Sequence, residues 1–247
     1  MPERVKKDKE AGDMERLDKL LANTGRWSRK EARELIRAGR VTVDGRPVRT
    51  PEEKYDPAAA FAVDGEPVSG EWLVYLMLHK PAGLVSATGD PRQPTVLELL
   101  PEHLRRVGLF PAGRLDKDTE GLLLLTNDGP LAHRLLSPRR HVDKTYFVRV
   151  EGALDGSDAA AFAAGMALAD GLVCLPAGLE VLEEPDTALV TLREGKYHQI
   201  KRMLAARGKP VVYLKRLTMG PLALDPALAK GAWRPLTPEE LAALRAV

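Results

Sequence analysis

Apolar residues near the start of the chain recur with the spacing of an amphipathic helix. Leu17, Leu20 and Leu21 fall on one face when the chain is wound with 3.6 residues per turn. Glycine is common just past the last residue of a helix. The pattern therefore predicts a first helix that begins at Glu15 and ends near Gly25.

A second helix is predicted over residues 28–39. Ser28 and Glu31 stand three residues apart, which is the spacing of a capping box. In that motif a hydroxyl and a carboxylate satisfy free backbone N–H groups at a helix start. Leu35 and Ile36 belong to the apolar face of this helix, and a glycine closes it.

The segment after this helix is predicted to form a β-hairpin and a linker. Val41–Val48 contains two short apolar runs around an Asp-Gly pair, which supplies the positive φ angles of a tight hairpin turn. Pro51–Gly70 is expected to form one last strand and a linker. Residues 1–14 are rich in charged side chains, and we expect them to be a disordered leader. The sequence thus predicts a small domain over residues 15–70.

Residues 71–247 alternate strand-like and helical runs and are expected to form a second domain. The strand-like runs are Trp72–Leu78, Leu122–Thr126, Lys144–Glu151 and Thr187–Arg193. The helical runs are Leu97–Leu104, Leu131–Leu136, Asp158–Ala164 and His198–Arg207, and a last helix follows the capping box Thr237–Glu240. Because these elements do not follow a regular βαβ repeat, they predict an α+β domain. We recognise no internal repeat.

Composition excludes several classes of site. The 247-residue chain has a net charge of +2 and a single cysteine, Cys174, so it cannot form an internal disulfide or a cluster of thiolate metal ligands. Its five histidines lack the paired spacing of a zinc site. The longest apolar runs are strand-length, and the charged start lacks the apolar core of a signal peptide. We therefore expect a soluble, cytoplasmic protein without a metal.

The predicted small domain carries a basic surface. Residues 15–50 contain ten Lys and Arg against five Asp and Glu. Three arginines recur every four residues and so lie on one face of the second helix. Such a run is either a solvated face or a surface for nucleic-acid phosphates, and the single-faced repetition favours the second interpretation. The candidate RNA-binding residues are Arg29, Lys30, Arg33, Arg37 and Arg40.

A loop of mixed charge precedes the most apolar run of the chain. It comprises Gly113-Arg114-Leu115-Asp116-Lys117-Asp118-Thr119-Glu120-Gly121 and leads into Leu122–Thr126. One interpretation is a solvated turn. Three carboxylates at alternating positions could instead ligate magnesium or include the acid/base pair of a glycosidase, although the neighbouring Arg114 and Lys117 disfavour a cation site. A third interpretation is one carboxylate held ionised beside a cation.

The sequence of this loop resembles the signature of the pseudouridine synthases. These enzymes isomerise uridine in RNA with one aspartate in a Gly-Arg-Leu-Asp loop. Three further segments match the family pattern in the same order: His79–Gly83, Lys144–Tyr146 and Gly195–Met203. The family often has Asn where this chain has His79. Residues 16–48 resemble the RNA-binding module of the ribosomal protein S4 type. The resemblance implies an S4-like domain of two helices and a small sheet, followed by a catalytic domain with a mixed, mainly antiparallel sheet.

The resemblance also implies which residues carry out catalysis. Asp116 would act either as a nucleophile at the sugar or as a base on the neighbouring carbon, and the sequence leaves both routes open. Lys201 occupies the position of the basic residue that the family places beside this carboxylate, with Arg202 as the alternative partner. Asp118 is expected to serve as a turn or cap acceptor.

Three more residues would contact the substrate. Tyr146 would lie against a target base taken out of its helix, unless it is an ordinary strand tyrosine. Arg114 would help to hold the flipped-out nucleotide, and the alternative is a local salt bridge. Ile200 would pack under the base or in the core.

The same resemblance indicates a substrate. Tyr197–Gln199 and Tyr213–Arg216 are close in sequence to the small-subunit branch of the family. This resemblance favours 16S over 23S ribosomal RNA as the partner, in a partly assembled small subunit. The isomerisation needs no cofactor, and we expect a monomer. A non-catalytic RNA-binding factor for ribosome assembly is the alternative from a different class. Such a factor would have no product for an Asp116→Ala substitution to abolish.

Overall fold

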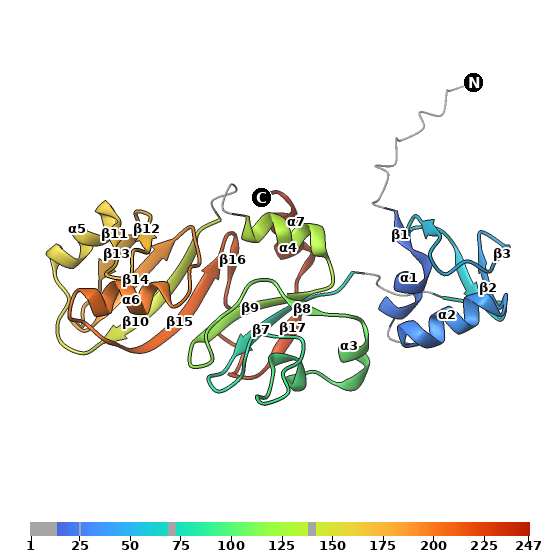
Figure 1. Cartoon of the computed structure of the whole chain (residues 1–247), viewed down its shortest axis with the longest axis horizontal. Coiled ribbons are helices and arrows are strands. Elements are labelled where there is room, and N and C mark those ends of the chain that lie inside the picture. The colour runs from blue at the N-terminus through green and yellow to red at the C-terminus, as the bar shows by residue number, and fades with distance from the viewer. Residues whose placement is uncertain (1–13, 25, 69–72, 138–141) are drawn as a thin grey trace, which may run out of the picture. The chain divides into compact units, whose positions relative to one another are not determined.

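The computed structural model describes residues 14–24, 26–68, 73–137 and 142–247 (Figure 1). The predicted leader, apart from Met14, and the last two residues of the predicted linker lie outside these ranges. The described residues divide into two compact units. The small unit contains the residues up to Leu73 together with Pro101–Gly108, and the large unit contains Val74–Leu100 and Leu109–Val247.

The small unit contains the two predicted helices, α1 (Leu17–Asn23) and α2 (Arg29–Arg37). Both hydrogen bonds of the Ser28–Glu31 capping box are formed, which confirms the predicted start of α2. The first helix begins later than expected, because Glu15 and Arg16 form strand β1, which pairs with β4 (Lys54–Tyr55). Leucines of both helices pack with the sheet in one apolar core.

Two similar hairpins form the four-stranded sheet of the small unit. The predicted hairpin joins β2 (Val41–Val43) to β3 (Arg46–Val48), and a second joins β5 (Phe61–Val63) to β6 (Glu66–Pro67). Both turns are Asp-Gly pairs with positive φ, at Asp44-Gly45 and Asp64-Gly65. The expectations of one last strand and of no repeat were therefore wrong. Residues 43–48 and 63–68 share the pattern Val-Asp-Gly-x-Pro-Val, and each builds a hairpin.

A nine-stranded sheet organises the large unit. Its main order is β13 (Gly178–Val181), β14 (Thr187–Leu192), β10 (Lys144–Val150), β15 (Val211–Met219), β9 (Glu120–Thr126), β7 (Tyr75–Lys80) and β17 (Trp233–Pro235). Two short strands pair at the side: β16 (Leu222–Ala223) with β15 and β8 (Phe110–Pro111) with β9. Every pairing is antiparallel except that of β9 with β15. The sheet is therefore mixed and mainly antiparallel, as expected.

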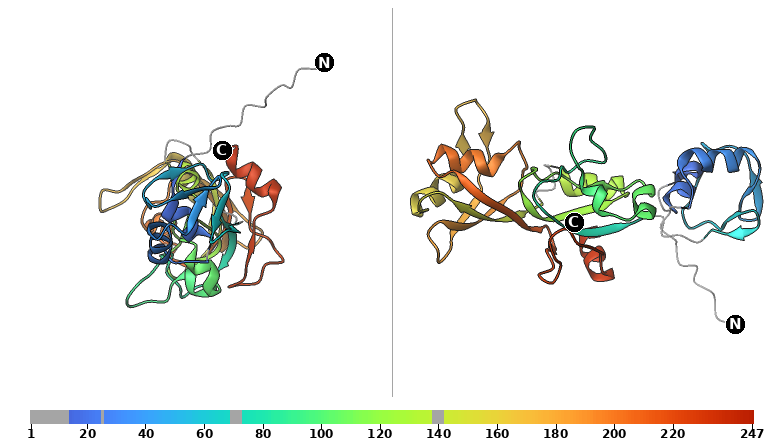
Figure 2. Two further views of the ribbon diagram at one scale, coloured as in Figure 1. Left: turned by 90° about the vertical axis from the view of Figure 1, so that its right-hand side faces the viewer. Right: turned by 90° about the horizontal axis from the view of Figure 1, so that it is seen from below.

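The helices of this unit lie around that sheet. They are η1 (Val96–Leu99), α4 (Gly129–Leu136), α5 (Gly156–Ala164), α6 (Gln199–Ala206) and α7 (Pro238–Arg245). Strands β11 (Met166–Ala167) and β12 (Val173–Cys174) form a separate ribbon. The long strand β15 runs from the part of the sheet near α5 and α6 to the part near α4 (Figures 1 and 2). Side chains of α4, α7, β7 and β9 share one core.

Among the other elements at which sequence and structure differ, three are informative. The predicted helix Leu97–Leu104 is two pieces, η1 and the small-unit helix α3 (Glu102–Arg106), with Pro101 between them. The strand predicted at Trp72–Leu78 lies at Tyr75–Lys80, and its first predicted residue is outside the described ranges. Strand β15 was not predicted, because its charged residues conceal a period-two pattern. No helix among the described residues is long and apolar enough to cross a membrane.

Candidate active site

The loop that carries Asp116 connects β8 to β9, and hydrogen bonds from neighbouring segments fix its backbone. The Ser86 hydroxyl donates to the carbonyl of Leu115 at 2.9 Å and accepts from its N–H at 3.1 Å. The N–H of Gly83 donates to the carbonyl of Lys117 at 2.8 Å. The main chain on both sides of Asp116 is therefore held in one conformation.

Lys80 holds the same loop through hydrogen bonds to its carbonyls. Its side chain is fully buried at the end of β7, and its ammonium donates to the carbonyls of Asp116, Lys117 and Thr119 at 3.1, 3.2 and 2.8 Å. A fourth acceptor is the carbonyl of Pro81 at 3.0 Å. Burial lowers the pKa of Lys80 to about 8, although nearby carboxylates act in the opposite direction. The carbonyls of Asp116 and Lys117 also accept from the N–H groups of Thr119 and Gly83, so the buried charge is the donor that matters most for Pro81 and Thr119.

Gly121 is fixed by the close approach of two strands. It is the second residue of β9, where the parallel pairing with β15 sets it against Arg216. A Cβ at Gly121 would lie 2.2 Å from the carbonyl oxygen of Arg216, and the φ angle there is +108°. Only glycine satisfies both conditions. The packing of β9 against β15 therefore requires glycine at the last position of the charged loop.

Asp116 and Lys201 form an ion pair across the site. The Lys201 ammonium lies 3.1 Å from the Asp116 carboxylate, and the two side chains are 20% and 27% exposed. It also contacts the carboxylate of Asp118 at 2.5 Å, so Asp118 is a second partner of Lys201, a role that the sequence analysis did not assign to it. Burial opposes the charged form of Lys201, but its bonds to the two aspartates prevail and raise its pKa.

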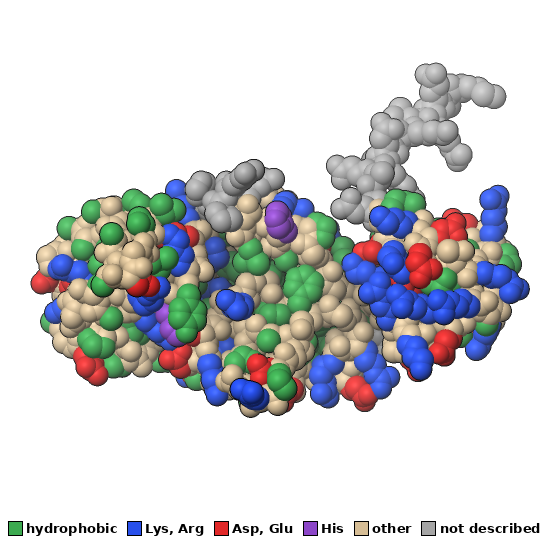
Figure 3. All heavy atoms as spheres, in the orientation of Figure 1, with side chains coloured by type: hydrophobic (Ala, Val, Ile, Leu, Met, Phe, Trp, Pro, Cys, Tyr) green, Lys and Arg blue, Asp and Glu red, His purple; other side chains and the backbone are tan. Residues whose placement is uncertain are grey.

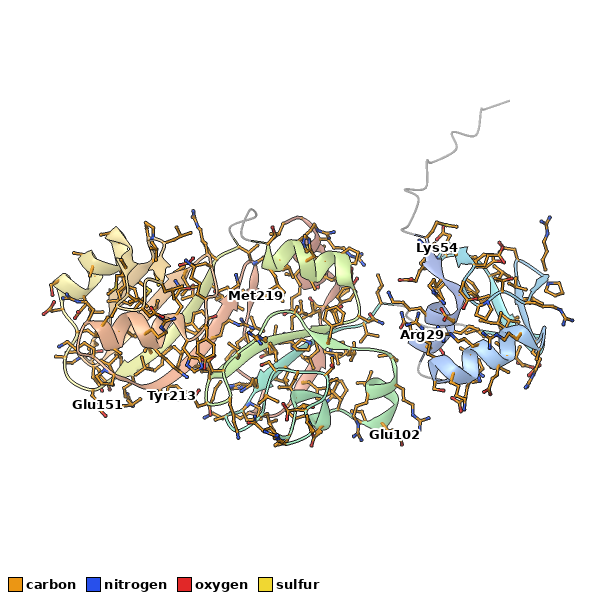
Figure 4. All side chains as sticks on the ribbon, in the orientation of Figure 1. Arg29, Lys54, Glu102, Glu151, Tyr213 and Met219 are labelled. Atoms are coloured by element: carbon orange, nitrogen blue, oxygen red, sulfur yellow. The ribbon has the colours of Figure 1, made fainter. Side chains whose placement is uncertain are left out.

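The third carboxylate of the loop points elsewhere. Glu120 is buried and accepts from the hydroxyl of Tyr213 at 2.7 Å, and it pairs with Lys230 at 2.7 Å. Tyr213 lies on β15, where Figure 4 labels it. Glu120 is thus committed to a structural network and does not form an acid/base pair with Asp116. Within the described ranges, no three His, Cys, Asp or Glu side chains are placed to hold a metal ion.

His198 is a member of this site that the sequence analysis did not select. Its Nε2 lies 3.6 Å from the Asp116 carboxylate. The residue adopts a left-handed conformation, with φ +49°, directly before α6. The ring of Tyr197 stacks on that of His198, with centroids 3.8 Å apart and planes 17° apart. The available signal was position, because His198 precedes Lys201 by one helical turn.

A cavity of about 500 Å³ brings most of the predicted residues together. Five of the six implied site residues line it: Arg114, Asp116, Tyr146, Ile200 and Lys201. Tyr146 is buried on β10, and Leu192 and Leu214 extend the apolar part of the wall. Arg202 is the exception, because it is paired with Asp170 and does not line the cavity. The cavity combines an apolar wall with one carboxylate–ammonium pair, an arrangement that suits a flat polar ring.

The five candidate RNA-binding residues differ in their surroundings. Figure 3 shows Lys and Arg gathered on the visible face of the small unit, over α1 and α2, and Figure 4 labels Arg29 there. Arg29 and Arg33 both bond the buried carboxylate of Asp18, at 3.3 and 2.8 Å. Burial opposes the charge of Asp18, but arginine hydrogen bonds prevail and lower its pKa to about 2. Arg40 pairs with Asp64.

Lys30 and Arg37 have no such partner. Both side chains are exposed on α2, and neither forms a salt bridge with a described residue. The basic surface therefore combines arginines that also stabilise the fold with two cations that are available to a ligand.

Comparison with known proteins identifies the two units. Residues 74–206 match the RNA pseudouridylate synthase family, and residues 15–59 match the S4 domain. An uncharacterised RNA pseudouridine synthase of Bacillus subtilis is 51% identical over 230 residues, which cover 92% of this chain and 96% of that protein.

Two relatives carry the name ribosomal small subunit pseudouridine synthase A. The protein from Pseudomonas aeruginosa is 46% identical, over 92% of this chain and 98% of its own length. The protein from Escherichia coli is also 46% identical, over 93% and 99%. A crystal structure of a pseudouridylate synthase superposes with a TM-score of 0.67 at 37% identity, over 93% of this chain and 99% of that one. The chain therefore belongs to the RNA pseudouridine synthase family, as an enzyme with an S4 domain ahead of its catalytic unit.

Proposed function

We propose that this enzyme converts a uridine of 16S ribosomal RNA to pseudouridine, with Asp116 as the catalytic carboxylate. The observation that carries the proposal is the Asp116–Lys201 ion pair of 3.1 Å inside a cavity that Tyr146 lines. Relatives whose names specify the ribosomal small subunit support the choice of RNA. We further propose that the enzyme acts in the cytoplasm, as a monomer, on a partly assembled small subunit and without a cofactor.

The proposed chemistry assigns one task to each group. The bond between the sugar C1′ and the base N1 breaks, the base turns and C1′ bonds to C5, after which C5 loses its proton and N1 takes one up. Asp116 starts this sequence by attacking C1′ or by taking a proton from C2′. At the end Asp116 is set free again, by losing its bond to C1′ or by returning the C2′ proton. Lys201 compensates the carboxylate charge in a partly buried site. Tyr146 holds the detached base by stacking, so that it turns without leaving the cavity.

The two units would divide recognition from chemistry. We propose that residues 15–70 bind RNA phosphates through Arg29, Lys30, Arg33, Arg37 and Arg40, and that residues 71–247 catalyse the reaction. The phosphate contacts would supply affinity that does not depend on sequence. Arg114, which is exposed at the cavity, would hold the flipped nucleotide.

Tritium release tests the proposal directly. RNA labelled at uridine C5 loses tritium only when C5 forms its new bond. We expect release from 16S RNA assembled with ribosomal proteins, and none with Asp116→Asn. Asp186→Asn, which alters a carboxylate in an exposed ion pair with Arg149, is the matched control and should keep full activity. Release from 23S RNA alone would contradict the substrate, and no release from either RNA would contradict the activity.

A further inference from the structure

Tyr197 is unusually exposed for an aromatic residue at a cavity. The residue is 70% exposed, the highest value among the large apolar residues that the structure describes. It nevertheless lines the same cavity as Asp116. A single exposed aromatic ring is unremarkable in itself. The surroundings of Tyr197 are what distinguish it.

The ring is held in place by a second ring. His198 covers one face of Tyr197 at 3.8 Å, nearly parallel, and the exposure of Tyr197 leaves ring surface open to solvent. His198 achieves this with φ +49°, a conformation that few residues other than glycine adopt. Such backbone conformations are strained and concentrate at functional sites.

The turn that presents the two rings is fixed internally. The buried amide of Gln199 accepts from the N–H of Lys196 at 3.1 Å and donates to the carboxylate of Glu194 at 2.5 Å. The ring pair is thus a preorganised surface that needs no ordering when a ligand binds. Cations also stand around the cavity, since Arg114, Lys117 and Lys196 line it together with Tyr197.

A flat open ring beside cations has the chemistry of a single-stranded RNA site, because bases stack on aromatic faces while cations hold the phosphates. We propose that Tyr197 stacks with an unpaired base that flanks the target uridine. His198 both supports that ring and lies 3.6 Å from the Asp116 carboxylate, so it links the flanking base to the reacting group. The inference rests on the proposed function and adds a second base-binding position to it.

The test is a substitution series at Tyr197. Stacking contributes sequence-tolerant affinity that alanine-type substitutions reduce by roughly 5- to 150-fold. We expect Tyr197→Phe and Tyr197→Trp to bind an RNA fragment that contains the target uridine with the same Kd as the wild type. Tyr197→Leu, which keeps bulk but loses the aromatic face, should raise Kd and KM within that range and change kcat less. Val212→Ala, at an exposed apolar residue of β15, is the control.

A second arm locates the stacked base. An abasic nucleotide is placed at each position next to the target in turn, and Kd is measured with wild type and Tyr197→Leu. At the stacked position, the missing base should raise the Kd of the wild type but leave the Kd of Tyr197→Leu unchanged. His198→Asn tests the link, because asparagine tolerates the left-handed turn without supplying a ring. We expect it to lower both affinity and kcat.

The outcomes separate this inference from the proposed function. If the wild type releases tritium, but Tyr197→Leu binds RNA like Tyr197→Phe, the stacking site is refuted and the isomerase stands. If every abasic position weakens wild type and variant equally, the stacking site is likewise refuted. If the wild type releases no tritium from either RNA, the proposed function itself fails.

Discussion

Lys80→Met tests whether the buried ammonium holds the catalytic loop. Methionine fills a similar volume but cannot donate, so the carbonyls of Pro81 and Thr119 would lose their donor. The carbonyls of Asp116 and Lys117 would keep the N–H groups of Thr119 and Gly83. Each such carbonyl costs about 1–3 kcal/mol when it is left unsatisfied. Methionine also avoids burying a charge, and the fall in the pKa of Lys80 from 10.5 to about 8 corresponds to roughly 3 kcal/mol. Two unsatisfied carbonyls cost about 2–6 kcal/mol, so the net expected loss is about 1 kcal/mol.

The assay is unfolding of the large unit by heat or urea. A loss of this size should lower its Tm by roughly 2–4 °C for a unit of this size. Lys117→Met, on the same loop but exposed, is the matched control and should leave Tm unchanged. If Lys80→Met has the same Tm as the wild type, the carbonyls do not depend on Lys80, and the reasoning is refuted.

The pH dependence gives the same residue a second signature. The folded pKa of Lys80, about 8, lies below its ordinary value of 10.5, so between these values the unfolded chain binds more protons. The contribution of Lys80 to the free energy of unfolding should therefore increase as the pH rises from about 8 towards 10.5. Urea titrations across this range should show the wild-type advantage over Lys80→Met widening. A constant difference would contradict the lowered pKa.

Three other substitutions test the site and the fold. Lys201→Met should lower kcat by roughly 30- to 150-fold, about 2–3 kcal/mol, and Lys201→Arg should retain much of the activity in the tritium assay. Lys30→Gln combined with Arg37→Gln should flatten the slope of log Kd against log salt by roughly 1.4–1.8 without changing Tm, and an unchanged slope would make them solvated cations. Gly121→Ala should destabilise the sheet by more than about 4 kcal/mol, whereas Gly129→Ala, whose Cβ meets open space, should not; equal Tm values would refute the packing argument.

Several elements were predictable because their signals lie within a few residues of one another. The Ser28–Glu31 box starts α2, and the Thr237–Glu240 box starts α7. Asp44-Gly45 forms its hairpin turn with the expected positive φ angles. Capping and turn formation depend on local backbone geometry, so a short stretch of sequence contains all the information.

The second hairpin and strand β15 show how local patterns are overlooked. Asp64-Gly65 carries the same signal as the first turn, but it stands in a segment rich in proline and alanine that resembled a linker. Arg216 is buried in β15, where its Nε donates to the carbonyl of Leu122. A buried arginine breaks the apolar alternation by which a strand is recognised. The partner that makes its burial possible lies far away in the sequence.

By itself the sequence determined the capped helices, the first hairpin and the charged loop, and through its motifs the resemblance to the pseudouridine synthases. The tertiary structure decided how the functional groups meet. It pairs Lys201 with Asp118 as well as Asp116, buries Lys80 beneath the loop and brings His198 to the carboxylate. These contacts join residues that are tens of residues apart in the chain. Only the pairing of β7, β9, β10 and β15 sets their distances, because long-range geometry follows from sheet register and not from local preference.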